Sequence, residues 1–332
     1  MQQIINWGIL GDAGIAKKAI IPAIQKAHNA NIMAIGSQKR APKQTAEEFN
    51  IPKAYDSYEQ LLLDPNIDAI YIPLPNSLHK KWVIEAALNK KHILCEKPAA
   101  LSSNEVKEML SVCNQNKVKF LEAFMYQFHP QHHRVREILL SGEIGEVKQM
   151  NSTFTYLLDI TGNNIRLNQN LGGGSLYDVG CYCIHAIRSI LQDEPISVYC
   201  KGNIDEGNEV DLTVQGVMTF QNKVMATFTS SFEQHPSNTY EVIGTKGKII
   251  VPHAFRPDKQ DGVGELKIIT KEGTRLEHEV EDQYRAQIEY FSKAILTDKE
   301  ELISNEKHTI QNMQVIDACF QSLIENKSVD IV

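Results

Sequence analysis

The side chains with the clearest chemical potential fall into two groups that are far apart in the sequence. Lys97 stands in a Cys-Glu-Lys-Pro tetrapeptide that directly follows an apolar run. Asp178, Tyr182 and His185 are spaced by four and then three residues, so on a helix they share one face. An ammonium group can stabilise a forming alkoxide, and a phenol can give or take the proton of a hydroxyl group. The two groups therefore indicate proton and hydride chemistry at a carbonyl or an alcohol.

Each of these residues also has a simpler interpretation. Most lysines in a lone Glu-Lys-Pro tripeptide point into water, and a helix end often carries a partly exposed polar stripe. His185 either contacts a substrate or belongs to a buried hydrogen-bond network. Arg166, shortly before three consecutive glycines, either reaches the pocket or lies exposed. These alternatives stay open on the residues alone.

A glycine turn near the amino terminus predicts a nucleotide site. Against the pattern G-x-G-x-x-G/A, Gly11 and Ala16 fit the first and third positions, and Ala13 takes the middle one beside Gly14. Small residues let backbone N–H groups approach a pyrophosphate at a helix amino terminus. A turn without a ligand is the alternative. The expected cofactor-binding residues of this turn are Gly11, Asp12, Ala13, Gly14, Ile15 and Ala16.

The end of the second expected strand indicates which nucleotide is bound. NAD enzymes usually carry an acid there for the ribose hydroxyls, but this chain has Ser37-Gln38-Lys39-Arg40. Ser37 can hydrogen-bond a 2′-phosphate, and Lys39 or Arg40 can neutralise it. A solvated loop with ordinary basic residues is the alternative. We expect NADP(H) to be preferred over NAD(H).

The elements that must position these residues divide the chain in two. Residues 1–122 alternate β-rich and helical runs, which predicts an α/β Rossmann domain with a doubly wound, mostly parallel sheet. Residues 123–332 begin a different pattern of long alternating segments, which predicts an α+β domain for substrate binding and dimerisation, with a large open, mainly antiparallel sheet. Helices near Ser175–Leu191 and Asp282–Leu296 are expected to cover its inner face. A last helix, Lys307–Asn326, is expected at the end of the chain, either within the second domain or packed back on the first domain.

Composition and charge exclude several other classes. The 332 residues are 42% hydrophobic and 23% charged, as in a globular protein, and the net charge of −7 gives no electrostatic footprint for nucleic acid. No apolar run approaches the about 20 residues that span a bilayer, and no signal peptide is evident. The six cysteines are expected to be reduced thiols, and the histidines at 129, 132 and 133 lack ligand spacing. We expect a cytoplasmic protein without a metal, a membrane or a nucleic-acid partner.

Five segments, in order and over the full length, resemble the Gfo/Idh/MocA family, named for glucose–fructose oxidoreductase and inositol dehydrogenase. The segments are Trp7–Ala16, Asp68–His79, His92–Pro98, Glu122–Gln131 and Gly172–Cys183. The chain is most similar to the sugar dehydrogenase and dihydrodiol dehydrogenase-like members. The resemblance implies a Rossmann domain and an α+β domain whose open sheet often forms a dimer interface. It therefore implies a homodimer or a dimer of dimers through that sheet.

The resemblance also assigns residues to roles. It implies that Lys97, Asp178 and Tyr182 are catalytic, and that a cis peptide bond often precedes Pro98. The cofactor site is expected to include Pro73, Pro75, Asn76, His79, Glu96 and Lys97 beside the glycine turn. The expected substrate contacts are Lys97, Tyr126, Arg166, Asp178, Tyr182 and His185. The family pattern is broken at Ala13, which replaces a glycine, and at Gln127, where many similar members have arginine.

The activity that the resemblance implies is NAD(P)-dependent hydride transfer between the nicotinamide and a sugar, a polyol or a related carbonyl compound. Lys97 and Tyr182 would handle the proton, and Asp178 would fix a neighbouring hydroxyl. Two alternatives belong to the same fold. One is a non-catalytic NADP-binding sensor or scaffold, which would not need Lys97, Asp178 and Tyr182 together. The other is an enzyme that cleaves glycosides with the help of a tightly held NAD, and it would not consume the cofactor.

Overall fold

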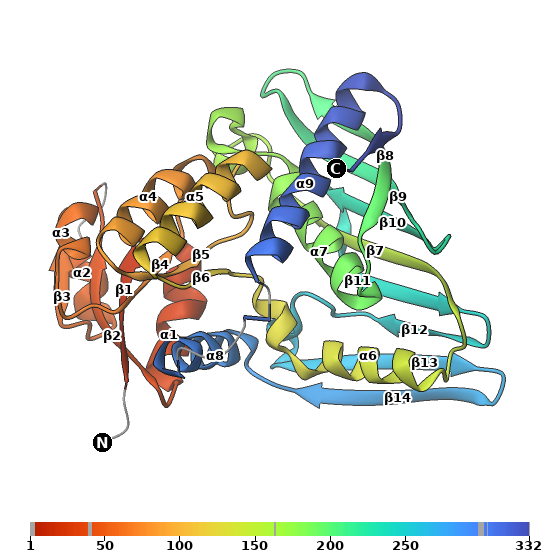
Figure 1. Ribbon diagram of the computed structural model, residues 1–332, viewed down its shortest axis with the longest axis horizontal. Helices are drawn as coiled ribbons and strands as arrows, with labels where there is room; N and C mark the ends of the chain where they lie inside the picture. The colour runs from red at the N-terminus through yellow and green to blue at the C-terminus, as the bar shows by residue number, and fades with distance from the viewer. Residues whose placement is uncertain (1–3, 39–41, 163, 298–301, 304, 332) are drawn as a thin grey trace. The chain divides into compact units, whose positions relative to one another are not determined.

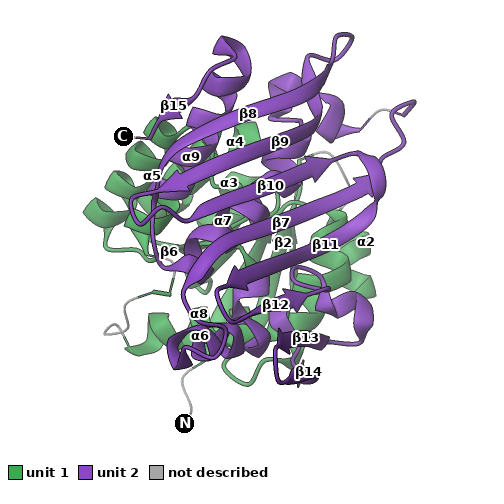
Figure 2. Cartoon of the chain, turned by 90° about the vertical axis from the view of Figure 1, so that its right-hand side faces the viewer, with its two compact units in different colours: residues 1–125, 284–310 green, residues 126–283, 311–332 purple. Residues whose placement is uncertain are grey.

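A computed structural model describes residues 4–38, 42–162, 164–297, 302–303 and 305–331 of the chain (Figure 1). Packing divides the protein into two compact units (Figure 2). Unit 1 comprises residues 1–125 and 284–310, and unit 2 comprises residues 126–283 and 311–332. The chain thus leaves unit 1 and later returns to it. The expected division at residues 122 and 123 places the returning segment in the second domain.

Unit 1 is built on a six-stranded parallel sheet in the order β3-β2-β1-β4-β5-β6. Its central strands are apolar and buried, which suits a sheet covered on both faces. The order in which strands are added to the sheet reverses between β1 and β4, and this switch point is where open α/β sheets bind ligands. The Rossmann prediction is confirmed. The strands are β1 (Ile5–Leu10), β2 (Ala30–Gly36), β3 (Lys53–Tyr55), β4 (Ala69–Ile72), β5 (His92–Cys95) and β6 (Phe120–Glu122).

Two helices of unit 1, α3 and α5, begin after a serine that caps them. Ser57 and Ser102 accept hydrogen bonds from the backbone N–H three residues later, and Pro75 directly precedes the first residue of α4. The crossover after β1 starts as a π-helix and continues as an α-helix. The elements are η1 (Ala16–Ile20), α1 (Ile21–Lys26), α2 (Pro42–Glu48), α3 (Tyr58–Leu62), α4 (Asn76–Leu88) and α5 (Ser103–Asn116).

Helix α8 (Gln283–Thr297) packs on unit 1. The indole Nε1 of Trp7 donates to Ser292 Oγ at 3.1 Å, and the rings of Trp7 and Phe291 lie 5.9 Å apart. Asn29 Nδ2 donates to the backbone oxygen of Glu289 at 2.9 Å. The prediction that this helix covers the second sheet is wrong, because its Phe291 and Ser292 pack on Trp7 of β1 in unit 1 instead.

Unit 2 contains a nine-stranded sheet in the order β14-β13-β12-β11-β7-β10-β9-β8-β15 (Figure 2). Strands β7 and β10 pair in parallel, and the other neighbours are antiparallel. The predicted mainly antiparallel α+β domain is confirmed. The strands are β7 (Val147–Leu157), β8 (Pro195–Asp205), β9 (Val210–Phe220), β10 (Met225–Ser231), β11 (Glu233–Gly244), β12 (Gly247–Val251), β13 (Val263–Thr270), β14 (Gly273–Val280) and β15 (Val329–Asp330).

One helical segment lies at the centre of unit 2. The π-helix η5 (Leu176–Gly180) continues directly into α7 (Cys181–Leu191), and together they contact β7 and β10. Nearly every residue of α7 is buried. Helix α6 (Pro130–Ser141) packs on β13 and β14, and α9 (Glu306–Glu325) passes from unit 1 into unit 2 along the sequence. Short turns complete the unit at η2 (Met125–Phe128), η3 (Ile165–Leu167), η4 (Gln169–Leu171) and η6 (Pro257–Gln260).

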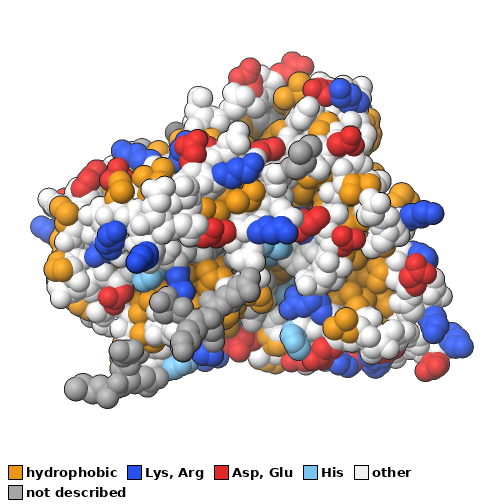
Figure 3. Space-filling view, in the orientation of Figure 1, with side chains coloured by type: hydrophobic (Ala, Val, Ile, Leu, Met, Phe, Trp, Pro, Cys, Tyr) orange, Lys and Arg blue, Asp and Glu red, His pale blue; other side chains and the backbone are white. Residues whose placement is uncertain are grey.

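One face of the molecule and the helices can be described by their charge and hydropathy. On the face shown in Figure 3, the described Lys and Arg side chains are interspersed with Asp and Glu. Within the described ranges, no helix has the length and apolar composition that crossing a membrane requires. All six cysteines are described, and they are buried free thiols.

Candidate active site

The turn after β1 has the geometry of a phosphate-binding loop. Gly11 has a φ of +130°, which favours glycine, and its N–H donates to Gly36 O at 2.8 Å, joining the ends of β1 and β2. A Cβ added at Gly14 would meet nothing within 4 Å, so the backbone there borders open space. In the part of the chain that the structure describes, no side chain caps the start of η1. The helix start therefore retains the N–H groups and the space that a pyrophosphate needs.

Asp12 within this turn is held in place by its neighbours. Its carboxylate lies 3.1 Å from Lys17 Nζ and accepts a hydrogen bond from Thr45 Oγ1 at 3.0 Å. The Asp12 side chain is only 6% exposed. The lysine offsets a negative charge that would otherwise repel a phosphate group at the same turn.

The expected 2′-phosphate site is described only in part. Ser37 is buried, and its N–H donates to Tyr55 O at 3.1 Å, at the end of β2. Lys39 and Arg40 lie outside the described residues. The contribution of these three residues to nucleotide choice stays a prediction.

Lys97 follows β5 at the carboxyl edge of the parallel sheet, and the residues around it are fixed by carboxylates. Glu96 accepts a hydrogen bond from the Tyr71 hydroxyl at 2.6 Å, and buried Glu122 accepts one from Ala99 N at 2.8 Å. The peptide bond between Lys97 and Pro98 is cis, as the resemblance implies. Lys97 itself is half-buried. The sheet edge thus presents one lysine from a backbone that is held on both sides.

His79 is fully buried between two backbone carbonyl groups. Its Nδ1 lies 2.9 Å from Pro98 O, and its Nε2 lies 2.8 Å from Leu74 O. Burial, together with the nearby charge of Lys97, lowers the pKa of His79 to about 4, although the two carbonyls favour the protonated ring. The neutral ring donates to one of these oxygens. His79 therefore joins the loop before α4 to the segment of Lys97, and direct contact with a cofactor stays a prediction.

In unit 2, the carboxylate of Asp178 accepts hydrogen bonds from two side chains. Its Oδ2 accepts the Tyr156 hydroxyl at 2.6 Å and Arg166 Nε at 2.9 Å. The Asp178 side chain is 17% exposed and that of Arg166 is 40% exposed. Burial and the Asp178 charge raise the pKa of Tyr156, and the same charge raises the pKa of Arg166. Arg166 is thus neither a simple exposed arginine nor buried, and Tyr156 is a partner that the spacing of the sequence does not indicate.

Tyr182 follows Asp178 on the same helix and is embedded in aromatic side chains. Its ring centroid lies 5.4 Å from that of Phe154, 5.6 Å from Phe255 and 5.9 Å from Tyr126. Only 6% of Tyr182 is exposed. Packing on several sides fixes the ring, so its hydroxyl group has a defined position.

Tyr126, which packs on Tyr182, is fully buried together with His185. The Tyr126 hydroxyl and His185 Nδ1 form a hydrogen bond, and the two residues are 1% and 0% exposed. Burial raises the pKa of the Tyr126 hydroxyl well above its ordinary value. The buried network is therefore the role that the geometry gives His185. Contact of either residue with a substrate stays a prediction.

The histidines of the 129–133 segment have structural partners. His132 Nδ1 lies 2.9 Å from the Tyr240 hydroxyl and its Nε2 lies 2.9 Å from Ala254 O. His133, on the opposite side of α6, pairs with Glu137 at 3.1 Å. The residues that the structure describes contain no group of three or more His, Cys, Asp or Glu side chains placed to hold a metal ion.

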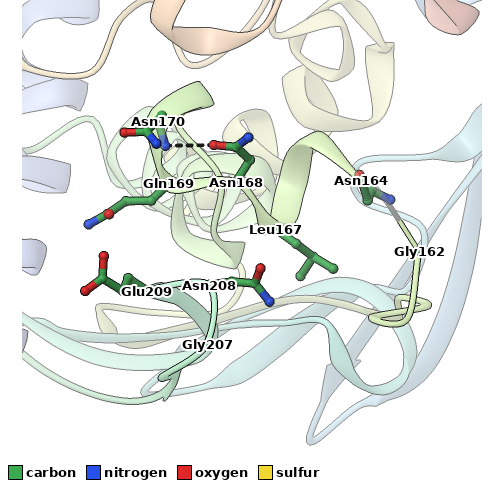
Figure 4. A pocket seen from close by; sticks show the side chains of 9 residues that line it. All are labelled: Gly162, Asn164, Leu167, Asn168, Gln169, Asn170, Gly207, Asn208 and Glu209. Atoms are coloured by element: carbon green, nitrogen blue, oxygen red, sulfur yellow. Dashed lines mark hydrogen bonds between the residues drawn. The ribbon is translucent and has the colours of Figure 1, made fainter.

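A polar hollow lies beside the segment that carries Arg166. It has a volume of about 320 Å³, and carboxamide side chains dominate its lining (Figure 4). Asn164 and Asn168 use their side-chain oxygens to accept backbone N–H groups two residues later, which holds their amides in place. The lining residues are Gly162, Asn164, Leu167, Asn168, Gln169, Asn170, Gly207, Asn208 and Glu209.

The parallel sheet, its switch point and the glycine turn define unit 1 as a dinucleotide-binding domain. Protein-family models give the same class. Residues 5–124 match the oxidoreductase family with an NAD-binding Rossmann fold, and residues 132–250 match the GFO/IDH/MocA C-terminal domain. The chain therefore belongs to the Gfo/Idh/MocA family, and it is an NAD(P)-dependent oxidoreductase acting on CH–OH groups.

Curated relatives and solved structures resemble the chain over most of its length. D-xylose 1-dehydrogenase (NADP(+)) 2 of Haloferax volcanii is 37% identical, over 98% of this chain and 99% of its own. Trans-1,2-dihydrobenzene-1,2-diol dehydrogenase of Xenopus tropicalis is 33% identical, over 74% of this chain and 75% of its own. A 3-ketoreductase from Actinomadura kijaniata, solved with NADP and TDP-benzene, has a TM-score of 0.91 at 26% identity, over 97% of this chain and 98% of that chain.

Proposed function

We propose that this oxidoreductase interconverts a hydroxyl group and a carbonyl group of a sugar or polyol, with NADP(H) preferred over NAD(H). The observation that carries the proposal is the fixed segment around Lys97, in which Tyr71 bonds to Glu96, His79 to Pro98 O and Glu122 to Ala99 N. A lysine in a fixed segment at the ligand-binding edge of the sheet favours a catalytic role over that of an ordinary solvent-exposed side chain. The named substrates of the relatives, D-xylose and a dihydrodiol among them, support the substrate class.

The residues of unit 1 fit a dinucleotide. Gly14 leaves the helix start open to the pyrophosphate, and Ser37 directly follows β2, where the adenosine ribose binds in this fold. Lys39 and Arg40 follow in the sequence, with no acid in this stretch to hold the ribose hydroxyls of NAD. Two relatives carry NADP in their names or crystals. When bound, the nicotinamide supplies or accepts the hydride.

The chain's own side chains handle the proton and the substrate. Oxidation of an alcohol releases a hydride and a proton, and we assign the proton to Lys97 and Tyr182. Tyr156 and Arg166 hold the carboxylate of Asp178, and we assign to that carboxylate the hydrogen bond from a neighbouring substrate hydroxyl. In reduction, the same donors stabilise the forming alkoxide.

Assembly and location are also part of the proposal. The open sheet of unit 2 carries half-exposed side chains such as Tyr199, Val217 and Met225, which supports a homodimer or a dimer of dimers through that sheet. Six free thiols support a location in the reducing cytoplasm.

The decisive experiment measures binding and turnover separately. Both tryptophans, Trp7 and Trp82, lie in unit 1, so their fluorescence reports titrations with NADPH and NADH. Aldoses, inositols and keto-sugars, starting with D-xylose, are then assayed at 340 nm. We expect tighter binding of NADPH and steady consumption of cofactor. Binding without turnover of any substrate would favour a sensor, and product without net cofactor change would favour redox-assisted glycoside cleavage.

Variants test the assigned residues in the same assays. Lys97→Ala should lower kcat by about 10²-fold or more, because it removes a proton-transfer group, while leaving the Kd for NADPH nearly unchanged. Tyr182→Phe should slow turnover and alter its pH dependence. Lys119→Ala, elsewhere in unit 1, serves as a matched control. Full activity of Lys97→Ala would remove Lys97 from the chemistry.

A further inference from the structure

A buried acid outside the predicted site lies at the start of the helix that carries Asp178 and Tyr182. Asp211, the second residue of β9, is only 3% exposed. A carboxylate in such surroundings is costly unless hydrogen bonds satisfy it. Its partners therefore indicate what it does.

Those partners belong to the first turn of η5 and the residue before it. Asp211 Oδ2 accepts the Ser175 hydroxyl at 2.8 Å and the backbone N–H of Leu176 at 2.7 Å. The Ser175 hydroxyl also lies 3.1 Å from Ser230 Oγ on β10. The carboxylate thus caps the helix from a neighbouring strand, and the positive end of the helix dipole favours its charge.

The glycine run before the helix makes this approach possible. Gly174 has a φ of +108°, and a Cβ added there would overlap Asp211 Oδ1. Any side chain at this position would push the carboxylate away from Leu176 N. The third of the three consecutive glycines therefore leaves the space that the Asp211 carboxylate of β9 occupies.

From this arrangement we propose that Asp211 is a positioning residue for catalysis. Its bond to Leu176 sets the start of η5, and Asp178 and Tyr182 follow two and six residues later on the same helix. A shift of the helix start would move both side chains together. The proposal rests on the proposed function, because it assigns Asp211 through the residues that handle the proton and the substrate hydroxyl.

The charge state of Asp211 adds a pH dependence. Burial raises the pKa of Asp211 to about 6, although Ser175 and Leu176 N–H favour the charged form. The Ser175 hydroxyl faces the carboxylate and is itself in contact with the Ser230 hydroxyl. The thiol of Cys319 on α9, which contacts Cys200 on β8, also lies near enough to feel the charge of Asp211. Below about pH 6 the protonated acid is a weaker acceptor for Leu176 N–H.

The test compares three variants of the full chain. Asp211→Ala removes the cap, and a misplacement of the reacting groups by about 1 Å should lower kcat by up to about 10²-fold with little change in the Kd for NADPH. Asp211→Asn keeps an oxygen acceptor, so it should retain most of the activity and lose the part of the pH profile near 6. Glu206→Ala, exposed in the hairpin before β9, is the control. A folded Asp211→Ala protein with unchanged kcat and KM would overturn the proposal.

A second measurement separates this proposal from the proposed function. Amide hydrogen exchange at residues 176–182 reports the helix start whether or not a substrate is known. Faster exchange in Asp211→Ala, with unchanged exchange in unit 1, supports the positioning role even if no sugar is turned over. Unchanged exchange at Leu176 overturns it, and loss of wild-type turnover on the whole substrate panel counts against the function alone.

Discussion

Replacing His79 tests whether burial of its neutral ring beside the Lys97 segment makes the free energy of unfolding depend on pH. His79 holds the loop before α4 to the segment of Lys97, with no exposed surface. We choose His79→Gln, because the amide can still donate to a carbonyl but does not titrate between pH 4 and 7. The matched control is His28→Gln, an exposed histidine of unit 1 that pairs with Glu289.

The size of the effect follows from the pKa of His79. In the unfolded chain the imidazole titrates near 6.5, whereas burial lowers its pKa in the folded protein to about 4. The unfolded state therefore binds more protons between these values, so acid destabilises the folded state. The full loss is present below pH 4 and amounts to roughly 3 kcal/mol. Above pH 6.5 the contribution disappears.

Urea unfolding followed by tryptophan fluorescence provides the assay. Trp7 and Trp82 are both buried in unit 1, so their signal reports the unit that contains His79. Between pH 7.5 and 4.5, wild type and His28→Gln should lose about 2–3 kcal/mol more unfolding free energy than His79→Gln. Parallel pH curves for wild type and His79→Gln would show that the ring is not buried in its neutral form.

Two further predictions concern unit 2. Gly216→Ala should destabilise the protein by about 1–3 kcal/mol, because the added Cβ would overlap the buried ring of Phe228. Thermal melting followed by circular dichroism measures this loss, and Gly207→Ala is the control. Tyr156→Phe removes one of the two described donors to Asp178 Oδ2 and should cost about 1 kcal/mol in kcat/KM while the melting temperature changes little. An unchanged kcat/KM would show that this hydroxyl does not set the Asp178 carboxylate.

The fold was predictable where the sequence pattern directly expresses burial. Runs such as Ala69–Ile72 and His92–Cys95 are apolar because both faces of a parallel sheet are covered, and the glycine turn marks the first crossover. Strand β3 and helix α3 were not predicted, because three to five residues are too few to show a period. The placement of α8 depended on a tertiary contact with Trp7 that no local pattern records.

The site was predictable only as far as its motifs extend. Lys97, Asp178 and Tyr182 lie in segments with characteristic spacing, whereas Tyr156 and Asp211 are single polar residues in alternating strands. Such residues look like ordinary strand positions until the sheet brings them beside a helix. The one available signal for Asp211 was the third consecutive glycine, whose close approach requires a partner.

The return of α8 to unit 1 has a consequence for how the protein is made. Trp7 of the sheet needs residues 284–297 of α8 for its cover, and these are separated from the first part of the unit by the 158 residues from 126 to 283. At translation rates of about 5–20 residues per second, a ribosome needs roughly 8–30 s to reach that helix. During that time the nascent amino-terminal segment lacks the side chains of Ser292 and Phe291 that cover Trp7 in the finished protein.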